Sequence, residues 1–283
     1  MRKIFPLLFV FLCVAQLKGI ETEEEKSQSP HSFTSNVSII SDYRFRGISQ
    51  TFRKPALQGG FDYAHQSGLF LGTWASNVDG TTNLYNNTSL EWDIYGGIKG
   101  KVFPKRLLDL NFALGAFYYY YPGGKVNLPE RVYYNTLELS VEISYKWLSV
   151  RYWQSVTNFT GYCSKNPPFN WDKMEYVKPN GSSRGTRYVE GNLNIPLPVC
   201  FVKGKKTFLF LHIGRLDIRH YPQVSYTDWR VTLTQEFAWF NLFVTYVGTN
   251  ARHSFYDVPD HGFHPHRYAL GAQGFVGGIT RTF

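Results

Sequence analysis

Residues 133–146 read YYNTLELSVEISYK, and from position 137 onward apolar and polar side chains alternate. The odd positions carry Leu137, Leu139, Val141 and Ile143. Because successive side chains of an extended strand point to opposite faces, the segment predicts a strand with one apolar and one hydrophilic face. A helix would instead place apolar residues three or four positions apart.

The same period of two recurs along most of the chain, which predicts an all-β fold built from antiparallel hairpins. Counting each alternating stretch gives twelve candidate strands. They are predicted at residues 33–46, 55–65, 69–78, 88–99, 107–121, 132–146, 148–159, 186–196, 207–215, 225–236, 239–249 and 268–283.

The connections between these strands alternate in length. Membrane barrels have short turns on the periplasmic side and longer loops outside, and an even strand number places both chain ends in the periplasm. The short connections fall at 65–68, 146–147 and 237–238, with mid-length ones at 100–106 and 197–206. The longer ones fall at 47–54, 79–87, 122–131, 160–185, 216–224 and 250–267.

Soluble sandwiches also alternate, so three further features decide for the membrane. The apolar faces carry almost no charge, as expected where a mid-bilayer Lys or Arg costs about 2–4 kcal/mol. Aromatic residues gather at strand ends, in the run 118–121 and at Trp147 and Trp239, which is typical of interfacial belts. The chain ends in Phe283, the usual signal for the barrel-insertion machinery.

These features predict a closed, antiparallel, up-and-down transmembrane β-barrel of about twelve strands over residues 33–283. The sheet must close because an unpaired backbone group in lipid costs several kcal/mol. Arg281 interrupts the apolar row of the last strand, and near the interface its guanidinium can reach the headgroups.

The start of the chain predicts export. Residues 1–19 combine a basic start, an apolar run and a small residue at the end, as a cleaved signal peptide does. The apolar run is shorter than the roughly 20 residues that a spanning helix needs. Residues 20–32 are acidic and polar, and predict a disordered periplasmic lead-in.

The net charge bears on possible binding partners, and the cysteine content bears on disulfide pairing. Without residues 1–19 the chain keeps 27 of its 30 basic residues against 21 acidic ones, a net charge of +6. No basic cluster on a helix, zinc pattern or helix-turn-helix pattern accompanies this balance, so nucleic acid is not expected as a partner. Cys163 and Cys200 fall at opposite ends of the predicted barrel, so we expect them to stay unpaired.

Residues 41–51, SDYRFRGISQT, resemble the opening motif of the TorF family of porin-like proteins from proteobacteria. The resemblance continues through 55–63, 72–78, 91–97, 188–192, 212–214 and 226–229. It implies an outer-membrane barrel with a signal peptide, and it implies little about the solute. The loop 160–185 is longer than the family pattern leads us to expect.

The hydrophilic faces predict an interior lined by charged and polar groups. Those candidates are Asp42, Arg44, Arg46, Asp62, Glu91, Asp93, Glu138, Glu142, Lys146, Arg151, Glu190, His212, Asp228, Arg230 and Glu236. They could border a water path that biases ion passage, or pair into a network that fills the barrel. Twelve strands lie between the filled eight-stranded and the open sixteen-stranded barrels, so both alternatives remain.

Arg44 and Arg46 are two apart on one predicted strand, so we expect them to point the same way. Two guanidinium groups on one face could grip an anion through paired hydrogen bonds.

Metal binding and catalysis are weaker hypotheses. The last loop carries His253, His261, His264 and His266 beside Asp257 and Asp260, which suits zinc or copper, but the spacing matches no standard site. We therefore predict no metal and no cofactor. No Gly-x-Ser-x-Gly motif occurs, His212 has no assignable serine, and the spacing of Glu138 and Glu142 is common in strands. We therefore predict no catalytic residues.

Together these patterns predict a porin-like channel in the outer membrane of a Gram-negative bacterium, for passive passage of small polar solutes or ions. The alternatives are a structural or adhesive barrel with an occluded lumen and, less favoured, an outer-membrane hydrolase. The expected partners are outer-membrane lipids and, through Phe283, the insertion machinery. A homo-oligomer is left open.

Overall fold

The computed structural model describes residues 29–79, 88–102, 110–126, 130–199, 201–259 and 267–283. The predicted signal peptide and most of the predicted lead-in lie outside these residues. The first strand begins at His31, two residues before the predicted start of the barrel.

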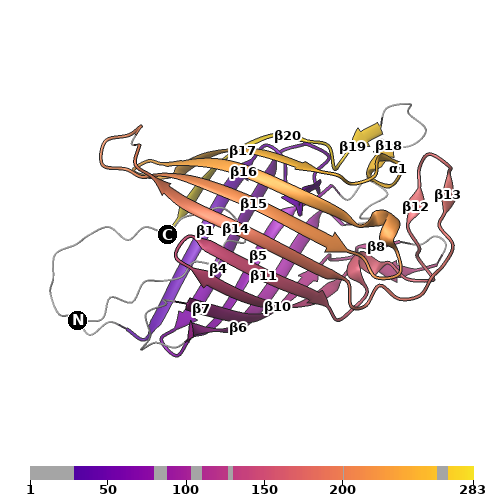
Figure 1. Ribbon diagram of the computed structural model, residues 1–283, viewed down its shortest axis with the longest axis horizontal. Coiled ribbons are helices and arrows are strands. Elements are labelled where there is room, and N and C mark those ends of the chain that lie inside the picture. Colours follow the sequence, from indigo (N-terminus) through magenta and orange to yellow (C-terminus); the bar gives the residue numbers. More distant parts are fainter. Residues whose placement is uncertain (1–28, 80–87, 103–109, 127–129, 200, 260–266) are drawn as a thin grey trace.

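Among the described residues, twelve antiparallel strands form one closed barrel (Figure 1). They are β1 (His31–Ile40), β4 (Ala56–His65), β5 (Leu69–Asn77), β6 (Leu90–Val102), β7 (Leu110–Tyr120), β10 (Thr136–Tyr145), β11 (Leu148–Ser155), β14 (Arg187–Leu197), β15 (Thr207–Asp217), β16 (Tyr226–Glu236), β17 (Asn241–Thr249) and β20 (Gly274–Thr282). Each strand pairs with its neighbours in this order, so the up-and-down prediction is confirmed.

The first and last strands close the ring. Asn36 lies opposite Thr282 in the register of β1 and β20. Beyond that pair, the backbone N–H of Phe283 donates to the carbonyl of Ser35 at 2.8 Å, and the N–H of Ser35 donates back at 3.2 Å. The barrel therefore presents no free sheet edge at this seam, as the lipid environment demands.

Short helices and strands cap one end of the barrel. Figure 1 places β8, β12, β13, β18, β19 and α1 at this end, and the start of β1 and the end of β20 at the other. The smaller elements are β2 (Arg44–Phe45), β3 (Ile48–Ser49), β8 (Lys125–Val126), β9 (Val132–Tyr133), η1 (Phe159–Gly161), β12 (Phe169–Asn170), β13 (Glu175–Tyr176), η2 (Pro222–Val224), α1 (His253–Tyr256), β18 (Asp257–Pro259) and β19 (Arg267–Ala269). No helix among the described residues has the length and hydropathy to cross a membrane.

The two faces of the strands divide as the alternation predicts. On β10, Val141 and Ile143 are exposed, whereas Ser140 and Glu142 are buried inside. The outer surface carries many large apolar side chains, among them Ile39, Leu57, Leu71, Ile94, Leu139, Val150, Ile213, Val231, Val244 and Ile279. An apolar exterior around a polar interior is the arrangement of a transmembrane barrel.

The prediction that the first strand runs to residue 46 is wrong. Strand β1 ends at Ile40, and the chain then turns into the barrel. Arg46 and Gly47 both adopt positive φ, at 47° and 80°, which forms the tight turn between β2 and β3. A Cβ at Gly47 would lie 2.4 Å from Cγ2 of Thr249, so the turn presses against the barrel wall. Residues 41–55 are called the lumen hairpin below.

Other predicted strands extend too far toward the loops. The last strand begins at Gly274 rather than at 268, and β10 begins at Thr136 rather than at 132. Residues 267–269 and 132–133 pair instead within the loop hairpins β18–β19 and β8–β9. Both segments are extended strands of loop hairpins, so a period of two along the chain does not by itself place the end of a barrel strand.

The lipid-facing side of β10 gives a first prediction. Val141→Arg places a cation near mid-bilayer and should lower the free energy of unfolding by about 2–4 kcal/mol. Leu148→Arg, at the start of β11 beside a short turn, should cost only about 0–1 kcal/mol because the charge reaches the interface. Urea unfolding in lipid vesicles measures both, and equal losses would contradict the orientation described here.

Candidate functional site

The lumen hairpin is the feature that organises the barrel interior. It pairs Arg44 with Ser49 and Phe45 with Ile48, and the N–H of Ser49 donates to the carbonyl of Leu270 at 3.0 Å. Its side chains are largely withdrawn from solvent. Phe52 is 1 % exposed. The segment therefore fills space inside the barrel instead of forming the outer loop predicted for residues 47–54.

Asp42 holds the two arms of the lumen hairpin together. Its carboxylate accepts hydrogen bonds from Nε of Arg44 at 2.5 Å, from the hydroxyl of Ser49 at 2.6 Å and from that of Thr51 at 3.3 Å. Charge-assisted bonds of this kind are among the stronger ones in proteins. Asp42 is therefore a structural acid within the hairpin, with its charge balanced by Arg44.

Arg46 crosses the lumen to the opposite wall. Its guanidinium donates to both carboxylate oxygens of Glu138, at 3.2 and 2.6 Å. Glu138 lies on β10, and β10 and β11 stand across the ring from β1, where the hairpin begins. The carboxylate is fully buried and also accepts from the hydroxyl of Ser155 at 3.1 Å. One bidentate ion pair thus anchors the hairpin across the barrel.

Aromatic rings surround the Arg46 guanidinium. Its carbon lies 4.1 Å from the ring centre of Tyr188, and the rings of Phe45, Trp153 and Phe159 lie within 5.6 Å. Rings stabilise a cation through their electron-rich faces, more so when water is excluded. The cation is therefore stabilised on several sides by groups of the protein itself.

The prediction that Arg44 and Arg46 share a strand and point the same way is wrong. Only Arg44 belongs to β2, and its NH1 donates to the carbonyls of Gly47, Leu270 and Ala272 at 2.8 to 3.1 Å. Arg46 turns to Glu138 instead. Both guanidinium groups are engaged inside the protein, so the expected joint anion clamp has no geometric basis.

A hydrogen-bond network lines the wall formed by β14, β15 and β16. The His212 ring contacts Asp228 through Nε2 at 2.8 Å and Asn192 through Nδ1 at 2.6 Å. The hydroxyl of Tyr188 donates to the other Asp228 oxygen at 2.9 Å. Glu190 lies 3.5 Å from His212 and accepts from the indole N–H of Trp153. These hydrogen-bond partners fix the orientation of the His212 ring, and no serine is among them.

On β10 and β11, Arg151 forms a buried ion pair with Glu142. Two further acids lie on β6, which is separated from β10 by β7. Glu91 and Asp93 are buried on β6, where the Tyr43 hydroxyl of the lumen hairpin donates to Glu91 at 3.1 Å. Neither acid forms an ion pair with another described residue.

The predicted interior residues divide into three groups. Asp42, Arg44 and Arg46 belong to the lumen hairpin, and Asp62, Glu91, Asp93, Glu138, Glu142, Arg151, Glu190, His212, Asp228 and Arg230 lie on inward positions of the barrel strands. Lys146 does not line the lumen, because it forms the exposed turn between β10 and β11 with a φ of 51°. Glu236 sits at the strand end, where it accepts from the N–H of Lys206 at 3.3 Å.

Sequence reasoning missed the inward aromatic residues. Tyr43, Trp74, Tyr119, Trp153 and Tyr188 are all buried inside the barrel. Their signal was available, since Tyr188 has the same parity as Glu190 and Trp153 the same parity as Arg151. Odd or even position along a strand would have assigned these aromatic residues to the lumen face. Their apolar character suggested the lipid face instead, which is why they were missed.

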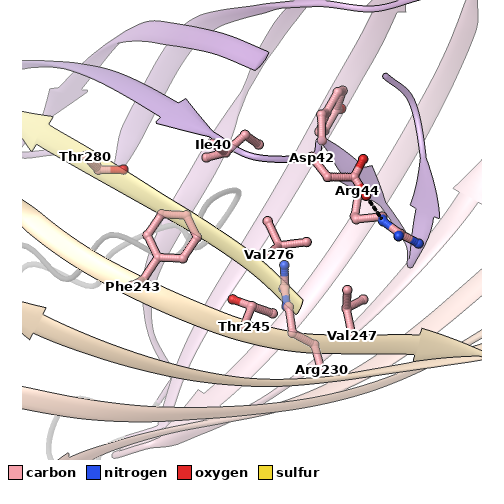
Figure 2. A pocket seen from close by; sticks show the side chains of 10 residues that line it. Ile40, Asp42, Arg44, Arg230, Phe243, Thr245, Val247, Val276 and Thr280 are labelled. Carbon is pink, nitrogen blue, oxygen red and sulfur yellow. Dashed lines mark hydrogen bonds and ion pairs between the residues drawn. The ribbon is translucent and has the colours of Figure 1, made fainter. Parts of the chain in front are cut away.

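Two small cavities border the lumen hairpin. The larger, of about 100 Å³, lies between the hairpin and the His212 network. The smaller, of about 50 Å³, is bordered by β1, β16, β17 and β20 (Figure 2). Both touch Tyr43, Arg44, Arg230 and Val247, so these four side chains separate them.

The histidine loop lies partly outside the described residues. His253 is exposed and contacts Asp257 at 2.9 Å, while His261, His264, His266 and Asp260 fall in the range that is not described. No group of three or more His, Cys, Asp or Glu side chains suited to a metal occurs in the described ranges. Cys163 is a free thiol, and Cys200 also lies outside the description.

The long loop 160–185 carries the small sheet β12–β13. It is tied to the last loop by an ion pair between Arg267 and Asp172 at 2.5 Å. The contact is exposed, so it joins two outer loops without forming an enclosed site.

A family model matches residues 24–283. The chain belongs to the Gcw_chp family. The members of this family are bacterial proteins of unknown function. A comparison with curated proteins finds no match.

Solved barrels resemble this Gcw_chp protein in fold. A KdgM porin in complex with disordered oligogalacturonate has 9% identity and a TM-score of 0.46, with 89% of this chain and 98% of that chain covered. The COG4313 outer membrane channel from Pseudomonas putida F1 has 10% identity, a TM-score of 0.40 and coverage of 94% and 100%. LpxR from Salmonella typhimurium has 10% identity, a TM-score of 0.40 and coverage of 88% and 99%. At these values the likeness assigns no function to the Gcw_chp chain.

The anchor of the lumen hairpin gives a second prediction. Glu138→Gln leaves Arg46 buried without a counter-ion and should destabilise the Gcw_chp barrel by about 3–5 kcal/mol. The double variant Arg46→Met with Glu138→Leu removes both charges and should lose much less. Chemical unfolding followed by tryptophan fluorescence measures the difference.

The exposed pair Arg215–Asp217 provides the control. Its side chains are 49% and 62% exposed, so Asp217→Asn should change stability by no more than about 1 kcal/mol. A Glu138→Gln variant as stable as Asp217→Asn would show that the lumen hairpin does not depend on this anchor.

Proposed function

We propose that this protein is a porin-like channel of the outer membrane for small polar solutes or ions, narrowed by the lumen hairpin. The observation that carries the proposal is the polar, charged interior enclosed by an apolar outer wall, with two cavities beside the hairpin. A protein that only needed to fill its barrel could do so with apolar side chains, without the cost of burying charges.

The size of the cavities limits what could pass in the conformation described. By this measure one water needs about 10–15 Å³ of space. The cavities of about 100 and 50 Å³ therefore have room for about 7–10 and about 3–5 waters respectively. Larger solutes require the lumen hairpin to move. The turn of the lumen hairpin is anchored by the ion pair of Arg46 with Glu138. We propose that this ion pair, called the latch below, must break before the hairpin can move.

A structural barrel with a permanently occluded lumen is the second candidate. It is favoured by the engagement of Arg44 and Arg46 within the protein and by the burial of Phe52. In that case the outer loops, tied together by Arg267 and Asp172, would carry the function.

The remaining assignments follow from this proposal. We place the barrel in outer-membrane lipid and propose Phe283, which is 63% exposed, as the signal for the insertion machinery. Arg281 donates to the carbonyl of Trp239 at 3.0 Å, which suits a residue at the periplasmic interface. We propose no enzymatic activity, because the partners of His212 among the described residues are Tyr188, Glu190, Asn192 and Asp228, with no serine, threonine or cysteine. The TorF resemblance and a homo-oligomer remain predictions.

Conductance in planar bilayers tests the channel. The unaltered protein should give small steps, and Arg46→Ala should enlarge them or raise the open fraction by releasing the latch. Arg215→Ala, the same change at an exposed outer position, should leave the steps unchanged. If both the unaltered protein and the Arg46→Ala variant stay silent across voltages, the channel is excluded and the structural barrel is favoured.

A further inference from the structure

The smaller cavity has one apolar wall. Ile40 on β1, Phe243 and Val247 on β17, and Val276 on β20 all face inward and are at most 8% exposed. Figure 2 shows these four side chains gathered around one space, with Thr245 and Thr280 among them. Interiors of membrane barrels are mostly polar, and here apolar side chains from three neighbouring strands, β1, β20 and β17, meet at one cavity.

Arg230 brings the one uncompensated charge to this cavity. It extends from β16 toward Val276 (Figure 2). Among the described residues it forms no ion pair and no hydrogen bond, and its Nε is buried without a partner. Its guanidinium lies over the ring of Phe210, 5.0 Å from the centre. A buried donor left without an acceptor is costly, so this group is suited to an acceptor from outside the protein.

The other polar groups at the cavity are already paired. Asp42 is occupied by Arg44, Ser49 and Thr51. The hydroxyl of Thr245 bonds with Thr232 at 2.8 Å, and that of Thr280 bonds with Ser38 at 2.6 Å. The Arg230 guanidinium is therefore the one polar group at this cavity without a partner among the described residues, and it lies beside an apolar surface. Its planar arrangement of N–H groups can donate two parallel hydrogen bonds.

We propose that this cavity binds a short-chain monocarboxylate, with the carboxylate on Arg230 and the alkyl chain against Phe243, Val247 and Val276. A guanidinium matches a carboxylate through two parallel hydrogen bonds. The volume of about 50 Å³ suits a ligand the size of acetate or propionate. The inference names a solute class for the proposed channel, and the binding itself is measurable without conductance.

The test measures propionate binding to the refolded full-length mature barrel in detergent micelles, by saturation-transfer NMR and calorimetry. Propionate should bind, and propylammonium, with a similar chain and the opposite charge, should not. Arg230→Gln should weaken propionate binding about tenfold or more, because a charge-assisted pair is lost. The matched change Arg215→Gln, at an exposed arginine outside the lumen, should leave it unchanged.

Two further variants keep the test decisive. Arg230→Lys preserves the charge but not the fork, and should weaken binding less than Arg230→Gln does. It replaces Arg230→Gln if that variant fails to fold, as judged by circular dichroism. Val276→Thr nearly preserves volume but adds a hydroxyl, and should weaken propionate more than formate because only propionate has a chain to bury.

Three outcomes would overturn the proposal: no propionate binding to the unaltered protein, equal binding by Arg230→Gln (or by Arg230→Lys, if that variant takes its place), or displacement of propionate by chloride as readily as by acetate. If the protein gives no conductance steps but binds propionate through Arg230, the channel proposal is wrong and the binding-site proposal stands. Conductance steps without propionate binding would keep the channel and remove the site.

Discussion

The pairing of every backbone N–H and C=O in the sheet is the constraint on which this molecule depends. In lipid an open edge is not tolerated, so β1 must meet β20, and the ring of twelve strands encloses a space that lipid cannot reach. Once the ring is closed, each strand has a lipid side and a lumen side. Charged residues near the middle of a strand can then be accommodated only inside, where they need partners, whereas charges at strand ends can reach the interface.

The interior meets that demand by bringing part of the chain into the lumen. The lumen hairpin supplies Arg46 to Glu138 and keeps Asp42 and Arg44 as an internal pair. Together with the Glu142–Arg151 pair and the His212 network, this leaves few charges unmatched. In a low-dielectric space, satisfied pairs rigidify the structure, whereas an unsatisfied group marks a place where a ligand or a movement is expected.

Charge matching fails on two opposite walls. On β6, Glu91 and Asp93 have no cation among the described residues, and across the ring on β16 Arg230 has no anion. The lumen hairpin lies between them, with Tyr43 reaching Glu91 and lining both cavities beside Arg230. In the proposed channel, an interior with acid on one side and base on the other would orient a solute that carries charge.

The sequence by itself determined the twelve strands, the alternation of short and long connections, and most of the charged residues that face inward, but not the inward aromatic and aliphatic residues. These follow from period two, because the side chains that share a face are fixed by the geometry of an extended chain. Only the tertiary structure decided that residues 41–55 leave the sheet and enter the lumen, that Arg46 meets Glu138, and that Arg230 stays alone. Those outcomes depend on contacts between strands far apart in the chain, and alternation along one strand carries no information about what stands across the barrel.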